Sequence, residues 1–200
     1  MHAALEKVEA NLDQPVLVGL EPERIDSELG YILPGSLDSS GTQEVARFIE
    51  KPDFTLAETI VREGAMWNTF IFAASAQAIV GLFMRRFSAL ALEMQVIVSR
   101  ALTSDSPGGV WATLVDLYDR LPTLDFSKDL LEGNESKLRV LRVPDCGWSD
   151  LGTPGRVAET LQRLPPEHRS HAQKSALFVN LAAQHALYGH GASDGVRASP

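Results

Sequence analysis

An adjacent acid and base, Glu50 and Lys51, follow a segment whose residue types suit a β-strand, residues 45–49. Pro52 comes next. It cannot donate to a sheet ladder and it biases Lys51 toward extended backbone, so the pair is predicted at a strand tip. Because side chains alternate along a strand, the two can line one cleft only where the chain bends. There the carboxylate could accept hydrogen bonds from sugar hydroxyls and the ammonium could meet a phosphate. The alternative is an exposed ion pair that closes the strand, and such pairs are weak.

A second candidate carboxylate, Asp150, stands in a short loop that runs from Gly147 to Gly152. Thr153 and Pro154 follow as a predicted N-cap and first helical residue, so the loop should join a strand to a helix. In α/β sheets, ligands gather where strands end and helices begin. A carboxylate at such a place can hold Mg²⁺, which completes its shell with phosphate and water. The alternative is that Asp150 only hydrogen-bonds within its turn.

Three further residues bear on a possible site. Gly30 lies in a strand predicted at 29–33, where a glycine marks either the close approach of a ligand or backbone, or a bulge. Asn68 precedes a strand predicted at 69–72 and could bind a hydroxyl or satisfy a turn. Cys146 is the single cysteine and has no predicted base beside it, so we expect a buried small hydrophobe and not a nucleophile.

The composition is that of an ordinary globular protein, with 44% apolar and 22% charged residues in a chain of 200. A net charge of −8 argues against nucleic acid or an anionic membrane surface as the main partner, because both select a basic stripe. One cysteine excludes an internal disulfide and fits a reducing compartment. No apolar run approaches the ~18 residues of a membrane span, and the first residues lack a signal-peptide layout. We therefore expect a cytoplasmic protein.

Predicted strands and helices alternate along the chain, which indicates the α/β class. Strands are expected at 15–20, 29–33, 45–49, 69–72 and 137–143. Helices are expected at 3–11, 55–64, 76–86, 88–101, 110–121 and 154–164, with a short helical turn at 126–131. Thr55 is expected to begin the second of these helices through a capping box.

Four short motifs occur in one order: Gly-Tyr-Ile at 30–32, Phe-Ile-Glu-Lys-Pro-Asp at 48–53, Trp-Asn-Thr-Phe-Ile-Phe at 67–72 and Gly-Trp-Ser-Asp-Leu-Gly-Thr-Pro at 147–154. With a helical insertion between the last two, the chain resembles the sugar-1-phosphate nucleotidyltransferases, in particular their mannose-1-phosphate guanylyltransferase branch. The resemblance implies a Rossmann-like fold, a mixed sheet with flanking helices. It also implies a nucleotidyltransferase-like domain over residues 1–164, followed by a helical to disordered tail at 165–200.

The same resemblance implies an activity and assigns roles to residues. Gly30 and Glu50 would contact the sugar, and Asn68 would help to hold the hexose. Lys51 would meet the sugar phosphate and serve catalysis, and Asp150 would bind a catalytic Mg²⁺. The implied reaction transfers a nucleotidyl group from a nucleoside triphosphate, GTP in this branch, to a hexose 1-phosphate, here mannose 1-phosphate, and releases pyrophosphate.

The sequence also departs from the family pattern. The family opens with a glycine-rich basic loop after its first strand and later supplies a second metal-binding aspartate, and we find neither after a predicted strand. We therefore expect the sugar-binding C-terminal part, with the N-terminal nucleotide-binding part missing. Half a sheet should expose an edge and favour self-association or a partner that supplies the other half. The missing loop favours the alternative of a non-catalytic sugar-phosphate-binding or regulatory module, and a fragment without function is a third interpretation.

Overall fold

The computed structural model describes residues 2–10, 13–103 and 107–165. They belong to two compact units, Met1–Cys146 and Gly147–Pro200. The tail predicted at 165–200 lies, from residue 166 onward, outside the described residues, and the domain predicted over 1–164 stays a prediction. Within the described part of the chain, no helix is both long and apolar enough to cross a membrane.

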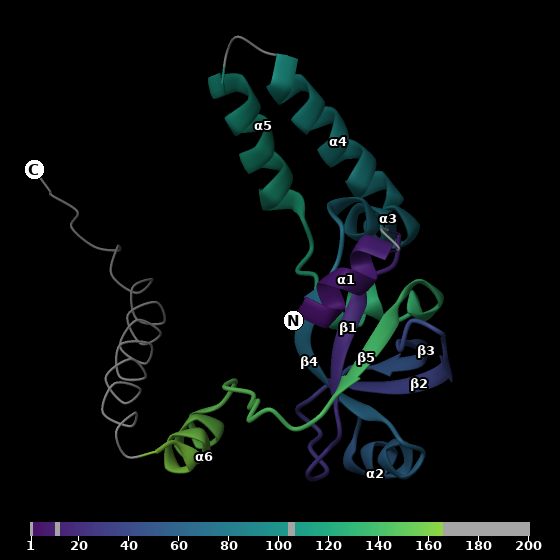
Figure 1. Cartoon of the computed structure of the whole chain (residues 1–200). Helices are drawn as coiled ribbons and strands as arrows, with labels where there is room; N and C mark the ends of the chain where they lie inside the picture. Colours follow the sequence, from purple (N-terminus) through teal and green to yellow (C-terminus); the bar gives the residue numbers. More distant parts are fainter. Residues whose placement is uncertain (1, 11–12, 104–106, 166–200) are drawn as a thin grey trace, which may run out of the picture. The chain divides into compact units, whose positions relative to one another are not determined.

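Five strands of the first unit form one mixed sheet that closes on itself in the order β1, β4, β2, β3, β5 (Figure 1). They are β1 (Val16–Leu20), β2 (Tyr31–Leu37), β3 (Gln43–Ile49), β4 (Met66–Ala73) and β5 (Arg139–Val143). β1 pairs parallel with β5, and every other neighbouring pair is antiparallel. The predicted α/β class and mixed sheet are thereby confirmed, although β4 begins at Met66, earlier than predicted.

The helices of the first unit are α1 (His2–Ala10), α2 (Phe54–Arg62), α3 (Ala76–Arg86), α4 (Ser88–Thr103) and α5 (Pro107–Arg120). A π-helical turn, η1 (Phe126–Leu131), and a 3₁₀ turn, η2 (Glu135–Lys137), precede β5, and the second unit contains α6 (Pro154–Arg163). Figure 1 shows α4 and α5 as a hairpin that continues from α3. The helical insertion predicted between β4 and β5 is therefore these three helices and the two short turns.

The core forms on both faces of the sheet because β1 is apolar throughout. All five of its residues are buried, as expected of a strand covered on two sides. One cluster takes a side chain from every strand and adds Leu82 of α3 and Leu130 and Leu131 of η1. A second cluster packs Ala4 and Val8 of α1 against β1 and the end of β4. The turn η1 is therefore part of the core and not a loose connection.

The helix after the Glu-Lys-Pro motif begins differently from the prediction. Asp53, and not Thr55, is the N-cap of α2, and its carboxylate accepts a hydrogen bond from the Leu56 amide at 2.8 Å. An aspartate at this position satisfies an amide that the first helical turn leaves without a partner. Pro52 and Asp53 thus fix the start of α2 directly after Lys51. The cap predicted at Thr153 is confirmed, and Ser75 caps α3 in the same way.

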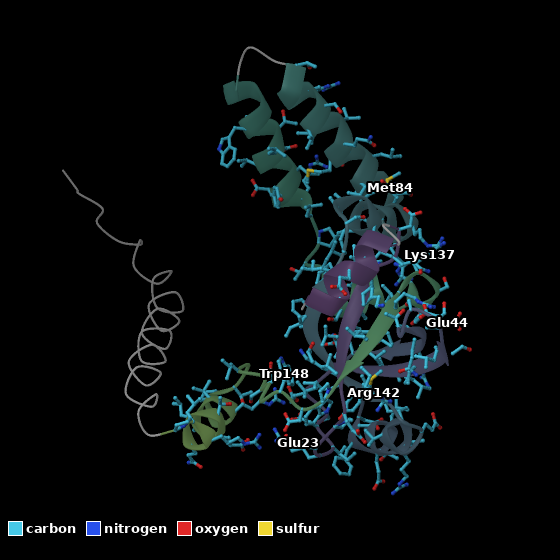
Figure 2. The ribbon with its side chains drawn as sticks, in the orientation of Figure 1. Glu23, Glu44, Met84, Lys137, Arg142 and Trp148 are labelled. Atoms are coloured by element: carbon cyan, nitrogen blue, oxygen red, sulfur yellow. The ribbon has the colours of Figure 1, made fainter. Side chains whose placement is uncertain are left out.

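The prediction of an exposed sheet edge is wrong, because β3 and β5 pair with each other and close the sheet. Gln43 lies opposite Val140, and Glu44 lies opposite Arg139. The Glu44 side chain (Figure 2) stands 3.8 Å from the Arg139 guanidinium, measured from Oε1 to Nη1. The pairing gives both strands a partner on the side that an open half-sheet would leave free.

A charged cluster in the turn between β2 and β3 also reaches β5. The Asp38 carboxylate accepts hydrogen bonds from Ser40, from Thr42 and from the guanidinium of Arg139. These bonds, those of Ser40 first and that of Arg139 next, hold the pKa of Asp38 well below its usual range. Because they favour the ionised carboxylate, the charge of Asp38 helps to hold the turn against β5.

We expect Asp38→Asn to lower the stability of the fold at neutral pH. A carboxyl group whose folded-state pKa is depressed stabilises the protein above its unfolded pKa of about 4, and this contribution is lost as the pH falls through the folded pKa. The gap between wild type and variant in urea midpoint should therefore be full above about pH 5 and shrink in stronger acid. A gap that stays constant from neutral pH down to about pH 2 would contradict a role for the charge.

Candidate functional site

The strand register brings Gly30, Glu50 and Asn68 together. Tyr31 lies opposite Ile49 of β3 and also opposite Trp67 of β4. Both pairings are antiparallel, so the residue before Tyr31 meets the residue after Ile49 and the residue after Trp67. Gly30, Glu50 and Asn68, each at or near the end of a strand, therefore form one group, which we call the candidate site.

Atomic distances show how tightly this group is packed. The Asn68 amide donates a hydrogen bond to the Gly30 carbonyl at 2.8 Å. A Cβ added to Gly30 would lie 2.5 Å from the Glu50 Oε2 atom and 3.4 Å from the Asn68 Cβ atom. The Glu50 carboxylate thus occupies the space that any side chain at position 30 would need. The sequence left open a close approach or a bulge at Gly30, and the group that approaches in the structure is the protein's own carboxylate.

The chain bends at Lys51, where the sequence analysis required a bend if both charges were to line one cleft. The φ angle of Lys51 is +49°, a left-handed conformation that residues other than glycine rarely adopt. Pro52 is buried and Lys51 is exposed, so the bend is fixed while the lysine side chain stays in solvent. Strained conformations of this kind persist where the surrounding structure enforces them, and they are concentrated at functional sites.

A tyrosine hydroxyl anchors the loop that leads into the site. The Tyr31 hydroxyl donates to the Asp26 carbonyl at 3.0 Å and accepts from the Asp26 amide at 2.9 Å and from the Trp67 indole at 3.2 Å. The Arg24 guanidinium lies 5.9 Å from the centroid of the Trp67 ring. These contacts hold the chain before Gly30 in place, so the bare backbone at Gly30 is presented in one position.

The turn η1 and its flanking residues supply a second set of side chains that the sequence analysis missed. The Glu50 amide donates to the Glu132 carboxylate at 2.6 Å. Ser127 hydrogen-bonds the Glu50 side chain, and the charge of Asp125 acts on it. The sequence analysis expected a short helical turn here, but nothing in its residue spacing indicated that it would meet the end of β3.

These neighbours change the acidity of Glu50. Burial raises the pKa of Glu50, and the negative charge of Asp125 acts in the same direction. Lys51 lowers the pKa, Glu132 raises it, and the Ser127 hydrogen bond lowers it. The net effect is a raised pKa, so the folded protein holds this carboxylate at a cost. A buried carboxylate with a perturbed pKa beside bare backbone is typical of a ligand site, although structural acids show it too.

The side chain of Asn68 continues the site along β4. Its Oδ1 atom accepts a hydrogen bond from the Phe70 amide at 3.2 Å, as in a turn, so the amide nitrogen Nδ2 is the atom nearer to Gly30. Phe70 has a φ angle of +58° and is 59% exposed. The register between β1 and β4 shifts at this point. A bulge next to a polar side chain is a common way to aim residues at a ligand.

Asp150 lies in the second unit, and its surroundings match the alternative interpretation given for it. Its Oδ2 atom accepts a hydrogen bond from the Gly152 amide at 3.0 Å and pairs with the guanidinium of Arg156 on α6. Thr153 caps the same helix. In the part of the chain that the structure describes, no three metal-ligating side chains form a cluster. A metal at Asp150 stays a prediction.

The prediction for Cys146 is wrong, because this residue is exposed and not buried. It follows Pro144 and Asp145, which are also exposed, where the first unit ends. The segment itself belongs to no strand or helix and its residues are exposed, so a small apolar side chain here does not enter the core.

Polar groups gathered at the ends of strands in a mixed α/β sheet are the usual setting of a small-ligand site. The sequence profile of one family, the nucleotidyl transferases, matches residues 1–165. Because the match covers most of the chain, the protein belongs to the nucleotidyl transferase family.

The relatives that have a more specific activity in their names are distant in sequence. The chain is 26% identical over 136 residues to a putative mannose-1-phosphate guanylyltransferase of Vibrio cholerae, which covers 68% of this chain. It is 23% identical over 176 residues to a mannose-1-phosphate guanylyltransferase of Salmonella typhimurium, which covers 86% of this chain. The matches span only 28% and 35% of the length of these two relatives. The activity of these full-length relatives is therefore only a proposal for this chain.

Two solved structures share the fold. One, described as a mannose-1-phosphate geranyltransferase from Thermus thermophilus, matches with a TM-score of 0.55 and 26% identity, over 70% of this chain and 38% of that one. The other, a mannose-6-phosphate isomerase from Helicobacter pylori, matches with a TM-score of 0.51 and 16% identity, over 70% of this chain and 54% of that one. The second likeness concerns the fold alone.

We expect Gly30→Ala to destabilise the protein by no more than about 1 kcal/mol, because the new Cβ would displace the Glu50 carboxylate, which is the far end of a flexible side chain. Gly81→Ala in α3 is the matched control, since an added Cβ there meets nothing within 4 Å and alanine favours a helix. In a Glu50→Ala background the cost of Gly30→Ala should largely disappear, as urea unfolding of the double-mutant cycle would show. An undiminished cost in that background would contradict the packing described here.

We expect Glu50→Gln to raise the thermal midpoint at neutral pH, because it removes a buried charge next to Asp125 and Glu132. A carboxyl group with a raised folded-state pKa destabilises the fold above that pKa, and the penalty disappears as the pH falls below the unfolded value near 4. The advantage of the variant should therefore close in acid. A variant that melts below wild type at neutral pH would show that attraction to Lys51 outweighs burial.

Proposed function

We propose that this chain binds a hexose 1-phosphate and takes part in nucleotidyl transfer from a nucleoside triphosphate. The observation that carries the proposal is the group of Gly30, Glu50 and Asn68, closed by the bend at Lys51. Family membership supports the reaction class. The names of the relatives support mannose 1-phosphate and GTP as the substrates to test first.

In this proposal the residues of the candidate site contact different parts of the sugar phosphate. The Glu50 carboxylate accepts hydrogen bonds from sugar hydroxyls, and the Asn68 amide nitrogen donates one. Gly30 leaves room for the Glu50 carboxylate, so that Glu50 and the Gly30 backbone can contact the same sugar. Lys51 supplies a compact positive charge for the phosphate and is the residue assigned to catalysis.

The reaction needs positioning more than covalent chemistry from the protein. A phosphate oxygen of the sugar phosphate attacks the α-phosphorus of the nucleotide. The bond from that phosphorus to the oxygen bridging it to the β-phosphate breaks, and pyrophosphate leaves with the electron pair. Fixed cations that offset charge on the phosphates lower the barrier of such a transfer. Lys51 would supply one of these charges.

The proposal includes Mg²⁺, with Asp150 as the residue that would hold it. Both of the contacts described for this carboxylate reach Oδ2, so a hard oxygen ligand remains in Oδ1. Mg²⁺ commonly takes one or two protein carboxylates and completes its shell with phosphate and water. The bound ion would neutralise phosphate charge. Arg156 competes for the same carboxylate, so a metal at Asp150 would have to compete with this ion pair.

A second candidate function is sugar-phosphate binding without turnover. The glycine-rich basic loop that family members use for nucleotide phosphates follows no strand of this sequence, which favours this alternative. Turnover would then require a partner or a second copy that supplies the nucleotide side.

One experiment separates the two functions. The purified chain is given Mg²⁺, mannose 1-phosphate and GTP, and pyrophosphate release is measured with other sugar phosphates and nucleotides as controls. Release supports transfer by this chain. A thermal shift with mannose 1-phosphate but no release supports binding alone. Neither signal with any sugar phosphate would contradict both functions.

We expect Lys51→Met to weaken mannose 1-phosphate binding by about 10- to 100-fold, because it removes a charged partner of the phosphate. Turnover, where present, should be lost while the fold remains. Lys7→Met makes the same change on α1, which packs near Ala73, at the other end of β4 from Asn68. This control should bind as wild type does. Equal affinities of wild type and Lys51→Met would remove Lys51 from the site.

A further inference from the structure

A large apolar side chain stands in solvent beside the candidate site. Phe70 is 59% exposed, whereas the three residues before it in β4 are buried. Single exposed apolar residues are common and require no explanation on that ground alone. The position of Phe70 is unusual for a second reason, which is its backbone.

The backbone at Phe70 adopts a conformation that glycine tolerates better than phenylalanine does. Its φ angle of +58° is a strained left-handed value for a bulky residue. The Asn68 side chain enforces this conformation by accepting a hydrogen bond from the Phe70 amide. Thr69 fixes the next amide, that of Ile71, in the same way. The fold thus holds an aromatic ring outward at a place where glycine would relieve the strain.

Two separate connections join the Phe70 ring to Glu50. Along β4, Phe70 is bonded to Asn68, which adjoins Gly30 and the Glu50 carboxylate. Across the chain, the Phe70 ring meets the Phe126 ring edge-on, with centroids 5.9 Å apart. The next residue, Ser127, hydrogen-bonds the Glu50 side chain. The ring is therefore linked to the Glu50 carboxylate through neighbouring residues along two paths.

The Phe126 ring makes that surface rigid. It stacks on Phe72 with centroids 5.5 Å apart and an angle of 14° between the rings. Phe72 and Phe126 both pack on the main core. Phe70 thus rests on a supported ring, and its 59% exposure leaves part of the ring accessible to a ligand. Aromatic pairs of this geometry add to the stability of a contact beyond the area that they bury.

We propose that Phe70 forms the apolar wall of the hexose subsite and packs against a C–H face of the sugar ring. A pyranose carries hydroxyls around its rim and C–H bonds on its faces, so a site that grips it needs polar groups at the side and an apolar surface above or below. Glu50 and Asn68 supply the first, and Phe70 supplies the second. The proposal rests on the proposed function, because it specifies how the same site holds its sugar.

The test compares two probes, mannose 1-phosphate and inorganic phosphate, by isothermal titration of the purified chain. Phe70→Ala should weaken mannose 1-phosphate binding by about three- to tenfold and leave phosphate binding unchanged. Phe70→Tyr should retain wild-type affinity for both. Tyr118→Ala on α5 removes an aromatic ring that is similarly exposed, at 65%, and should change neither affinity.

Several outcomes would overturn the proposal. Unchanged mannose 1-phosphate affinity in Phe70→Ala would exclude a contact between Phe70 and the sugar. Equal weakening of mannose 1-phosphate and phosphate binding would show that the effect does not come from a contact with the sugar ring. Weakened GTP binding with intact mannose 1-phosphate binding would assign Phe70 to a nucleobase instead. If wild type binds neither mannose 1-phosphate nor phosphate, the proposed function fails and this assignment fails with it. Binding by wild type that Phe70→Ala leaves intact refutes only the assignment.

Discussion

The hydrogen bond from the Glu50 amide to the Glu132 carboxylate joins the two segments from which the site is built. One segment is the tip of β3, and the other is the chain that returns from the helical hairpin toward β5. The return is possible because β5 pairs with both β1 and β3 and so draws η1 and η2 against the body of the sheet. Without that closure, the tip of β3 would carry Glu50 into solvent as well as Lys51, which is already exposed.

Closure has an electrostatic consequence at the same place. It brings Asp125 and Glu132 close to a carboxylate that is already partly withdrawn from water. A fold selected only for stability would not gather three acids around one strand end, because each adds to the free energy of keeping Glu50 ionised. Perturbed acids of this kind are typical of ligand sites, although structural acids show them too. The bend at Lys51 adds backbone strain to the same short stretch.

The sequence grouped Gly30, Glu50 and Asn68 only through the resemblance of its motifs to a known family. The strand register that brings the three residues together is known only from the structure. The sequence did not reveal Asp125, Ser127 or Glu132, since their approach depends on where a long insertion returns, which no local pattern encodes. The closed sheet was missed for the same reason. Phe70 was missed for a different reason. Its type suits a strand, and only the backbone angle distinguishes it from its neighbours. The roles of the site residues and the metal at Asp150 remain predictions.

The parallel pairing of residues 16–20 with residues 139–143 also governs the order in which this chain can fold. β1 is synthesised well before β5, its parallel neighbour, which is the last strand that the structure describes in the first unit. Until β5 appears, one side of the most apolar strand has no ladder partner, and β3 lacks its second neighbour as well. Pairings of such long range are slow to form and leave strands open to intermolecular contacts in the interval. The same closure that shields the native sheet is therefore the step at which a nascent chain is most in need of protection from aggregation.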